Sequence, residues 1–361
     1  MSGETQGVAF NKPGDVTINL QLVNSCNFAC GHCMYACRPL DKQTEEWVSN
    51  DTLAELFSFL KPLIHQGHNI ALNLIGGEPT KDLDQFRRIL DFIMSQDRSN
   101  INVEMTSNGW WLRSWETLCK FASVTAPHID ELNIRLSNSI YHDPFRTPTE
   151  KRIFAIQSKK PSWSPYVNPL AQLLTYAFDY YDSEPLCPHC GKGLAPEKCP
   201  HCGEEITEDE YYEAQDNSYN ITGACQIPQL LKACENDQLY IDRKVTDDTK
   251  VSPVGRALKK GIGCQKVKCW DGRMIFTIEP SGKLQGICCV GGHVPLGHIR
   301  DGAKTLYNRA TKYISAIEEL PYNNPCAQCS TFAIKWIKEN SENQTNQSQT
   351  ACRGSQKVVV S

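Results

Sequence analysis

The chain has 361 residues, 40% of them hydrophobic and 22% charged, with a net charge of only −4 at pH 7. This composition excludes a disordered or fibrous protein, and the charge favours no nucleic-acid partner. No apolar stretch reaches transmembrane length and the start, MSGETQGVAF, lacks a secretory pattern, so we expect a cytoplasmic protein without a membrane partner. The 18 cysteines are unusual for a reducing cytosol and indicate metal binding.

Strand-like and helix-like segments alternate through the first part of the chain, which predicts parallel βα units and an α/β fold. We expect strands at 16–23, 69–75, 101–106 and 131–136, and helices at 51–66, 83–95 and 114–122, the first capped by Asp51. A polar motif follows each predicted strand. Because ligands bind at the carboxyl ends of parallel strands, these motifs should share one site.

The rest of the chain is less regular. We expect helices at 169–181, 208–214 and 303–320, a return to the core within 238–263, and a hairpin of 274–278 and 283–288 around Pro280-Ser281-Gly282. From Asn340 onward the sequence is polar and rich in Gln and Asn, which predicts disorder.

The sharpest motif is Cys26-Asn-Phe-Ala-Cys30-Gly-His-Cys33, directly after the first predicted strand. Thiolates are the standard ligands of iron-sulfur clusters, and three of them leave one iron of a 4Fe-4S cluster open for a ligand. A ferredoxin cluster or a zinc site is the alternative, because Cys37 follows. However, the first gap has three residues and Arg38 separates Cys37 from Pro39, which departs from the ferredoxin pattern.

The spacing of these three cysteines resembles the signature of the radical S-adenosylmethionine (SAM) superfamily. The resemblance implies that Cys26, Cys30 and Cys33 are catalytic and hold a 4Fe-4S cluster whose open iron binds SAM. In that family, an electron from the cluster cleaves SAM to a 5′-deoxyadenosyl radical, which abstracts hydrogen from a substrate. Flavodoxin or ferredoxin would be the electron donor.

Further motifs resemble the SAM-binding segments of the same family. Gly76-Gly77-Glu78-Pro79 resembles the motif that binds the SAM amino group, and Thr106-Ser107-Asn108-Gly109 resembles the third-strand motif. A polar segment after the fourth strand, containing His142, resembles one that contacts the ribose and carboxylate. The resemblance implies these cofactor-binding residues: Gly76, Gly77, Glu78, Pro79, Ser107, Asn108, Ser137, Arg146 and Arg256. A plain Asn-Gly turn is the alternative for the third-strand motif.

Two identical Cys-Pro-His-Cys-Gly knuckles, separated by eight residues, form a second cysteine group. Paired Cys-x-x-Cys turns present four thiolates tetrahedrally and predict a structural zinc site. Its ligands would be Cys187, Cys190, Cys199 and Cys202.

A third cysteine group surrounds the predicted C-terminal hairpin and resembles the Twitch/SPASM extension of radical SAM enzymes. The resemblance implies a second, auxiliary 4Fe-4S cluster held by Cys269, Cys288, Cys326 and Cys329, with Cys289 as the alternative to Cys288. Buried cysteines without metal are the other explanation.

The resemblance implies a partial (βα)6 TIM-like barrel with a zinc-ribbon insertion and a small C-terminal domain. We expect an N-terminal extension at 1–15, the radical SAM core at 16–186 and 204–263, the zinc ribbon at 187–203, the Twitch/SPASM-like domain at 264–338 and a disordered tail at 339–361. The expected function is radical modification of a peptide or protein. The alternatives are a radical SAM enzyme acting on a sugar, nucleoside or RNA, and a non-catalytic iron-sulfur electron carrier or zinc-binding interaction protein.

Overall fold

A computed structural model describes residues 15–33, 35–148, 150–151, 154, 197–198, 205–207, 226–236, 238–241, 274–286 and 295–318. The predicted zinc-ribbon cysteines, auxiliary-cluster cysteines and Arg256 lie outside these residues, as do the helices expected at 169–181 and 208–214 and the tail at 339–361.

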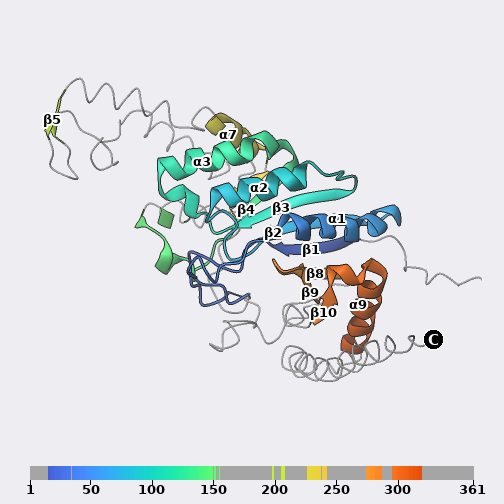
Figure 1. The fold of residues 1–361 in the computed structure, drawn as a ribbon. Coiled ribbons are helices and arrows are strands. Elements are labelled where there is room, and N and C mark those ends of the chain that lie inside the picture. The colour runs from blue at the N-terminus through green and yellow to red at the C-terminus, as the bar shows by residue number, and fades with distance from the viewer. Residues whose placement is uncertain are drawn as a thin grey trace, which may run out of the picture.

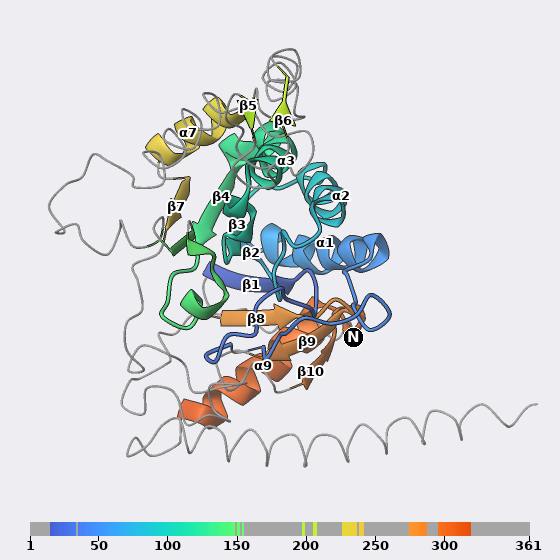
Figure 2. The ribbon, with the colours of Figure 1, turned by 90° about the vertical axis from the view of Figure 1, so that its left-hand side faces the viewer.

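One sheet organises the described chain, with strand order β10-β9-β8-β1-β2-β3-β4-β7 (Figures 1 and 2). The strands are β1 (Asp15–Gln21), β2 (Asn69–Ile75), β3 (Ile101–Ser107), β4 (Leu132–Leu136), β7 (Leu239–Ile241), β8 (Met274–Ile278), β9 (Lys283–Gly286) and β10 (Pro295–His298). From β8 through β1 to β7 all neighbours are parallel, whereas β9 and β10 are antiparallel. The predicted α/β fold is confirmed.

Helices between the first strands cover one face of this sheet (Figure 1). They are α1 (Asn50–His65), α2 (Leu83–Met94) and α3 (Trp115–Thr125), and the later helices are α7 (Ile227–Glu235) and α9 (Ala303–Glu318). Short 3-10 helices lie at η1 (Trp110–Arg113), η2 (Ala126–Glu131), η3 (Asp143–Phe145) and η8 (Ile299–Asp301). No helix among the described residues combines the length and apolar composition that crossing a membrane requires.

Helix starts follow ordinary capping chemistry. Ser49, and not the expected Asp51, caps α1, because its hydroxyl accepts the Thr52 amide proton at 3.0 Å. Asp82 and Ser114 cap α2 and α3 in the same way. Asp51 instead lies in the first turn of α1, where a negative charge is favourable.

Apolar and polar side chains alternate along the strands, so the two faces of the sheet differ in polarity. Ile18, Leu72 and Ile134 are fully buried on the face toward the helices. Residues of opposite parity, such as Asn19 and Asn73, are only partly buried and polar. Because neighbouring side chains on a strand point to opposite faces, the second face of the sheet is a polar surface.

The C-terminal hairpin continues the sheet of the core. β8 pairs in parallel with β1, with Asn19 opposite Thr277, and β9 and β10 follow as antiparallel neighbours. Next to β10, Arg300 of η8 donates to Glu55 of α1 at 2.7 Å. The strands expected in a separate domain at 264–338 therefore share one sheet with the first half of the chain (Figure 2).

Candidate functional site

The cysteine motif lies in a loop that leaves the carboxyl end of β1. Leu22 donates to the Ile75 carbonyl at 2.7 Å, which keeps the start of this loop beside β2. The Cys26 amide donates to the Arg38 carbonyl at 3.0 Å and thereby closes the loop. Tyr35 hydrogen-bonds Thr277 of β8, and burial raises the pKa of Tyr35 to about 12. The loop is thus held from both sides of β1.

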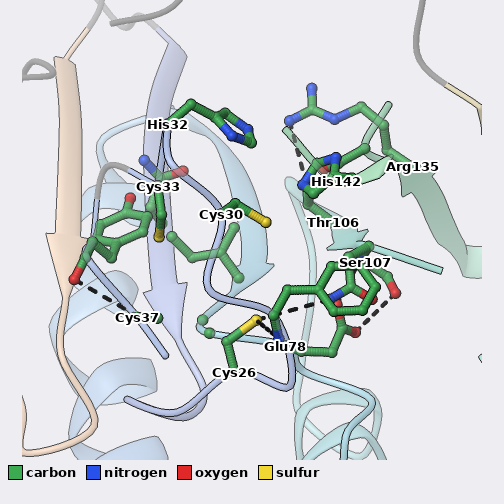
Figure 3. Close-up of a pocket in the computed structure, with 18 of the residues that line it drawn as sticks. Cys26, Cys30, His32, Cys33, Cys37, Glu78, Thr106, Ser107, Arg135 and His142 are labelled. Atoms are coloured by element: carbon green, nitrogen blue, oxygen red, sulfur yellow. Dashed lines mark hydrogen bonds between the residues drawn. The ribbon is translucent and has the colours of Figure 1, made fainter. Parts of the chain in front are cut away.

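Four cysteines of this loop line one cavity of about 380 Å³, and Figure 3 shows the sulfur atoms of three of them, Cys26, Cys30 and Cys33. The fourth is Cys37. Three are buried and Cys33 is partly buried, with the Phe28 ring packed among them. Burial, followed by the negative charge of Glu78, raises the pKa of Cys26. A thiol in this setting needs a metal to lose its proton readily.

The glycines after β2 bring that strand end against the cysteine loop. A Cβ on Gly77 would lie 1.7 Å from the Ser25 carbonyl oxygen, which no side chain can occupy. The Gly77 amide donates to the Val23 carbonyl at 2.8 Å, and Glu78 donates to that of Ser25 at 3.1 Å. Glycine at position 77 is therefore required by a close contact within the protein itself.

Glu78 is 1% exposed and lines the cavity. Its Oε1 accepts hydrogen bonds from Thr80 and from the Ser107 hydroxyl at 2.8 Å, and its Oε2 accepts from the Asn108 amide at 2.7 Å. Burial, the largest effect, raises the pKa of the carboxyl despite these bonds. The buried carboxylate joins the ends of β2 and β3.

Asn108 links the joined ends of β2 and β3 to the cysteine loop. Its side-chain amide donates to Asn27 Oδ1 at 2.9 Å and lies 3.8 Å from Cys26 Sγ. Its side-chain Oδ1 accepts a hydrogen bond from the Trp110 backbone amide at 3.0 Å. The turn that follows needs a positive φ, which Gly109 supplies at 78°. Cys26, Glu78, Ser107 and Asn108 thus form one connected corner of the cavity.

Two residues predicted after β4 have different surroundings. Ser137 lines the cavity, but Arg146 is not among the lining residues. The Arg146 guanidinium donates to the Ser137 carbonyl at 2.8 Å and to Asn138 Oδ1 at 3.1 Å, and it lies 3.4 Å from the Phe154 ring centroid. Burial lowers its pKa to about 10. Arg146 therefore holds the loop after β4 in place. Pro79 is likewise buried outside the cavity lining.

Two histidines lie beside Cys30. Cys30 Sγ and one ring nitrogen each from His32 and His142 all lie within 4.8 Å of one another. The rings of His32 and His142 meet edge to face with centroids 4.9 Å apart. Burial lowers the pKa of His142 well below its usual value, so this ring is neutral at pH 7. The sequence pattern marked His142 only as part of a polar segment and gave no sign of this contact.

The second face of the sheet contributes further polar groups to the cavity, of which the sequence analysis missed Asn19 and Asn73. Asn73 donates to Asn19 at 3.0 Å, and Arg135 donates to Thr106 at 3.2 Å. All four side chains line the cavity. The available signal was a polar residue at alternate positions of otherwise apolar strands.

No protein-family model matches the chain. Over 123 residues, or 34% of this chain, it is 31% identical to a GTP 3′,8-cyclase of Synechococcus elongatus, and the match spans 34% of that relative. The chain thus covers about a third of the length of this curated relative.

Two solved structures align over most of the chain. One is anSMEcpe with bound AdoMet, with a TM-score of 0.39, 14% identity and coverage of 93% of this chain and 96% of that chain. The other is BtrN in complex with AdoMet and 2-DOIA, with a TM-score of 0.33, 12% identity and coverage of 83% and 85%. Scores this low carry no argument about function.

Proposed function

We propose that this chain is a radical SAM enzyme that uses a 4Fe-4S cluster on Cys26, Cys30 and Cys33. The observation that carries the proposal is that these three thiols line the same cavity as Glu78 and Asn108, at the carboxyl ends of β1, β2 and β3. The local similarity to GTP 3′,8-cyclase, an enzyme, supports a catalytic role.

The residues present fit such a cluster. The three thiols belong to one loop that backbone hydrogen bonds close, and soft thiolates are the ligands that iron-sulfur clusters use. Beside Cys26, the buried Asn27 Nδ2 has no hydrogen-bond partner among the described residues. A buried donor of this kind calls for an acceptor, which a cluster sulfur or a bound cofactor would supply.

The cluster would supply the electron that cleaves SAM to a 5′-deoxyadenosyl radical. The protein's own contribution is to hold the cluster and SAM in position and to surround them. Glu78 and Asn108 fix the strand ends next to Cys26, and the Gly76-Gly77 backbone brings the turn after β2 against the cysteine loop. Ser107, Ser137 and the backbone of this turn would orient SAM. Phe28 and the partly buried Tyr35, Trp110 and Tyr141 pack against the thiols and would limit the access of water to a reactive intermediate.

The second, polar face of the sheet would bind the substrate. Asn19, Asn73, Thr106 and Arg135 offer hydrogen-bond donors and acceptors to the cavity, which favours a polar substrate. A peptide or protein is our first candidate, because its backbone amides match such groups. A sugar, nucleoside or RNA is the second candidate, and the relative named as acting on GTP supports it.

The other two metal sites remain proposals. Strands β5 (Glu197–Lys198) and β6 (Glu205–Ile206) pair antiparallel, directly before Cys199 and shortly after Cys202. A knuckle on a short hairpin supports the structural zinc site with Cys187 and Cys190. An auxiliary cluster on Cys269, Cys288, Cys326 and Cys329 would lie near the hairpin formed by β8 and β9.

The test is anaerobic reduction of the reconstituted full chain with SAM. The proposal expects 5′-deoxyadenosine, together with iron and sulfide for two clusters and one zinc per chain. Absence of deoxyadenosine from cluster-loaded protein would instead favour the electron carrier or the interaction protein. Adding candidate peptides, nucleotides or tRNA should then accelerate SAM cleavage only for the correct substrate class.

A further inference from the structure

His142 is a polar ring in a buried position that the proposed catalysis does not use. It is 7% exposed and lies at the start of η3, after β4. The Ser139 hydroxyl lies 3.1 Å from its Nδ1, and the His142 amide donates to the Ser139 carbonyl at 3.1 Å. These contacts fix the orientation of the ring and occupy one of its two nitrogens.

The ring faces the sulfur of Cys30. Cys30 Sγ and ring nitrogens of His32 and His142 lie within 4.8 Å of one another, and Figure 3 shows the Cys30 sulfur directed toward the His142 ring. The Phe28 ring, whose centroid is 6.1 Å from that of His142, covers the same region. Both side chains are buried, so water screens an interaction between the imidazole and the thiol only weakly.

The chemistry of the two groups decides which of them donates the hydrogen bond. A thiolate bound to iron can only accept a hydrogen bond, so the ring must offer it an N–H. If the Ser139 hydroxyl donates to Nδ1, the ring proton lies on Nε2, the nitrogen on the other side of the ring. Hydrogen bonds to sulfur stabilise the more negative, reduced state of an iron-sulfur cluster and raise its potential.

We propose that His142 is a positioning residue that donates a ring N–H to the Cys30 sulfur and thereby raises the reduction potential of the catalytic cluster. The inference rests on the proposed function, because it needs a cluster on Cys30. It assigns to the loop after β4 the task of making that cluster reducible by a cellular electron donor.

The experiment is an anaerobic redox titration of the reconstituted full chain. The reduced cluster is monitored through its electron paramagnetic resonance (EPR) signal, and the catalytic cluster is identified as the one whose signal changes when SAM is added. His142→Phe removes the donor but keeps an aromatic ring. At the wild-type midpoint its ratio of reduced to oxidised cluster should fall about tenfold, equivalent to about 59 mV for one electron. His142→Gln keeps an N–H and should retain most of the wild-type potential. The matched control is His128→Phe, because His128 contacts Asp91 in α2 and not the cavity.

Ser139→Ala provides a second test if His142→Phe fails to fold or to take up iron. It keeps the ring but removes the hydroxyl that selects the tautomer, so a smaller shift in the same direction is expected. An unchanged potential in His142→Phe, or in Ser139→Ala where the first variant fails, would overturn the inference. Wild-type protein with no SAM-responsive signal would instead contradict the proposed function.

Discussion

The loop after β1 and the turns after β2 and β3 meet at one edge of the sheet but use their polar side chains differently. In the loop, the thiols of Cys26, Cys30 and Cys33 face the cavity. In the turns, both oxygens of Glu78 accept hydrogen bonds from the protein itself. The difference teaches that a motif can mark a site while only part of it is available to a ligand. The other part builds the scaffold.

The largest effect should come from the cavity-facing thiols. Cys30→Ala is expected to abolish SAM-dependent EPR changes and deoxyadenosine formation, because a cluster with two protein thiolates is poorly held. Cys37→Ala is the matched control in the same loop. It should keep both activities, since the assignment gives Cys37 no ligand role. Loss of both activities in Cys37→Ala would show that Cys37 is also needed for the cluster, which contradicts the assignment of only three ligands.

Gly77→Ala tests the contact between the two regions. A Cβ placed 1.7 Å from the Ser25 carbonyl forces the cysteine loop to move. We expect a loss of about 3 kcal/mol in the free energy of unfolding, measured by urea denaturation of the apo-protein. Gly76→Ala, whose nearest contact would be the Val23 carbonyl at 3.0 Å, should cost clearly less. Equal losses for both variants would contradict the specific role of Gly77.

Glu78→Gln separates scaffold from ligand binding. The NH2 group of Gln cannot accept the Asn108 amide proton, which a carboxyl oxygen accepts in either protonation state, so a loss of about 2 kcal/mol in the free energy of unfolding is expected at pH 5. Glu116→Gln, at an exposed position of α3, is the control. If Glu78 served only a ligand, the apo-protein would be as stable as wild type.

The difference in stability between wild type and Glu78→Gln should depend on pH in a defined direction. Burial raises the folded-state pKa of Glu78, so the folded protein keeps a proton that the unfolded chain has already lost. Its contribution to stability is present below the unfolded pKa and declines as pH rises through the folded pKa. The stability advantage of wild type over Glu78→Gln should therefore shrink with rising pH in urea denaturation. An advantage that grows with pH would contradict this sign.

Ser107→Ala should have the smallest effect. It removes the 2.8 Å bond to Glu78 and the 3.0 Å bond from the Gly109 amide, but leaves the Asn108 amide bond to Glu78 intact. A loss of about 1 kcal/mol in unfolding free energy is expected for apo-protein. A loss as large as that of Glu78→Gln would mean that Ser107, and not the carboxylate, holds the corner together.

The first half of the fold was largely predictable, because local periodicity encodes it. The strand predicted at 69–75 agrees with β2. The helix predicted at 51–66 is shifted by one residue at both ends from α1, and the helix predicted at 83–95 ends one residue later than α2. The turn at Pro280-Ser281-Gly282 likewise predicted the hairpin of β8 and β9. What periodicity cannot encode is the parallel pairing of β8 with β1, which joins residues more than two hundred positions apart.

The site was predictable in position but not in detail. Strand ends located Cys26, Glu78 and Asn108, because parallel strands bring their carboxyl ends together. The internal hydrogen bonds of Arg146 and the proximity of His142 to Cys30 depend on side-chain directions in a loop. No sequence pattern specifies such directions.

The central claim is that one iron of the cluster on Cys26, Cys30 and Cys33 lacks a protein ligand. EPR spectroscopy of the anaerobically reduced full chain, recorded before and after adding SAM, tests it directly. The account predicts that SAM changes the spectrum of one cluster, because it binds the open iron. An identical spectrum with and without SAM, in protein that carries the full cluster, would contradict it.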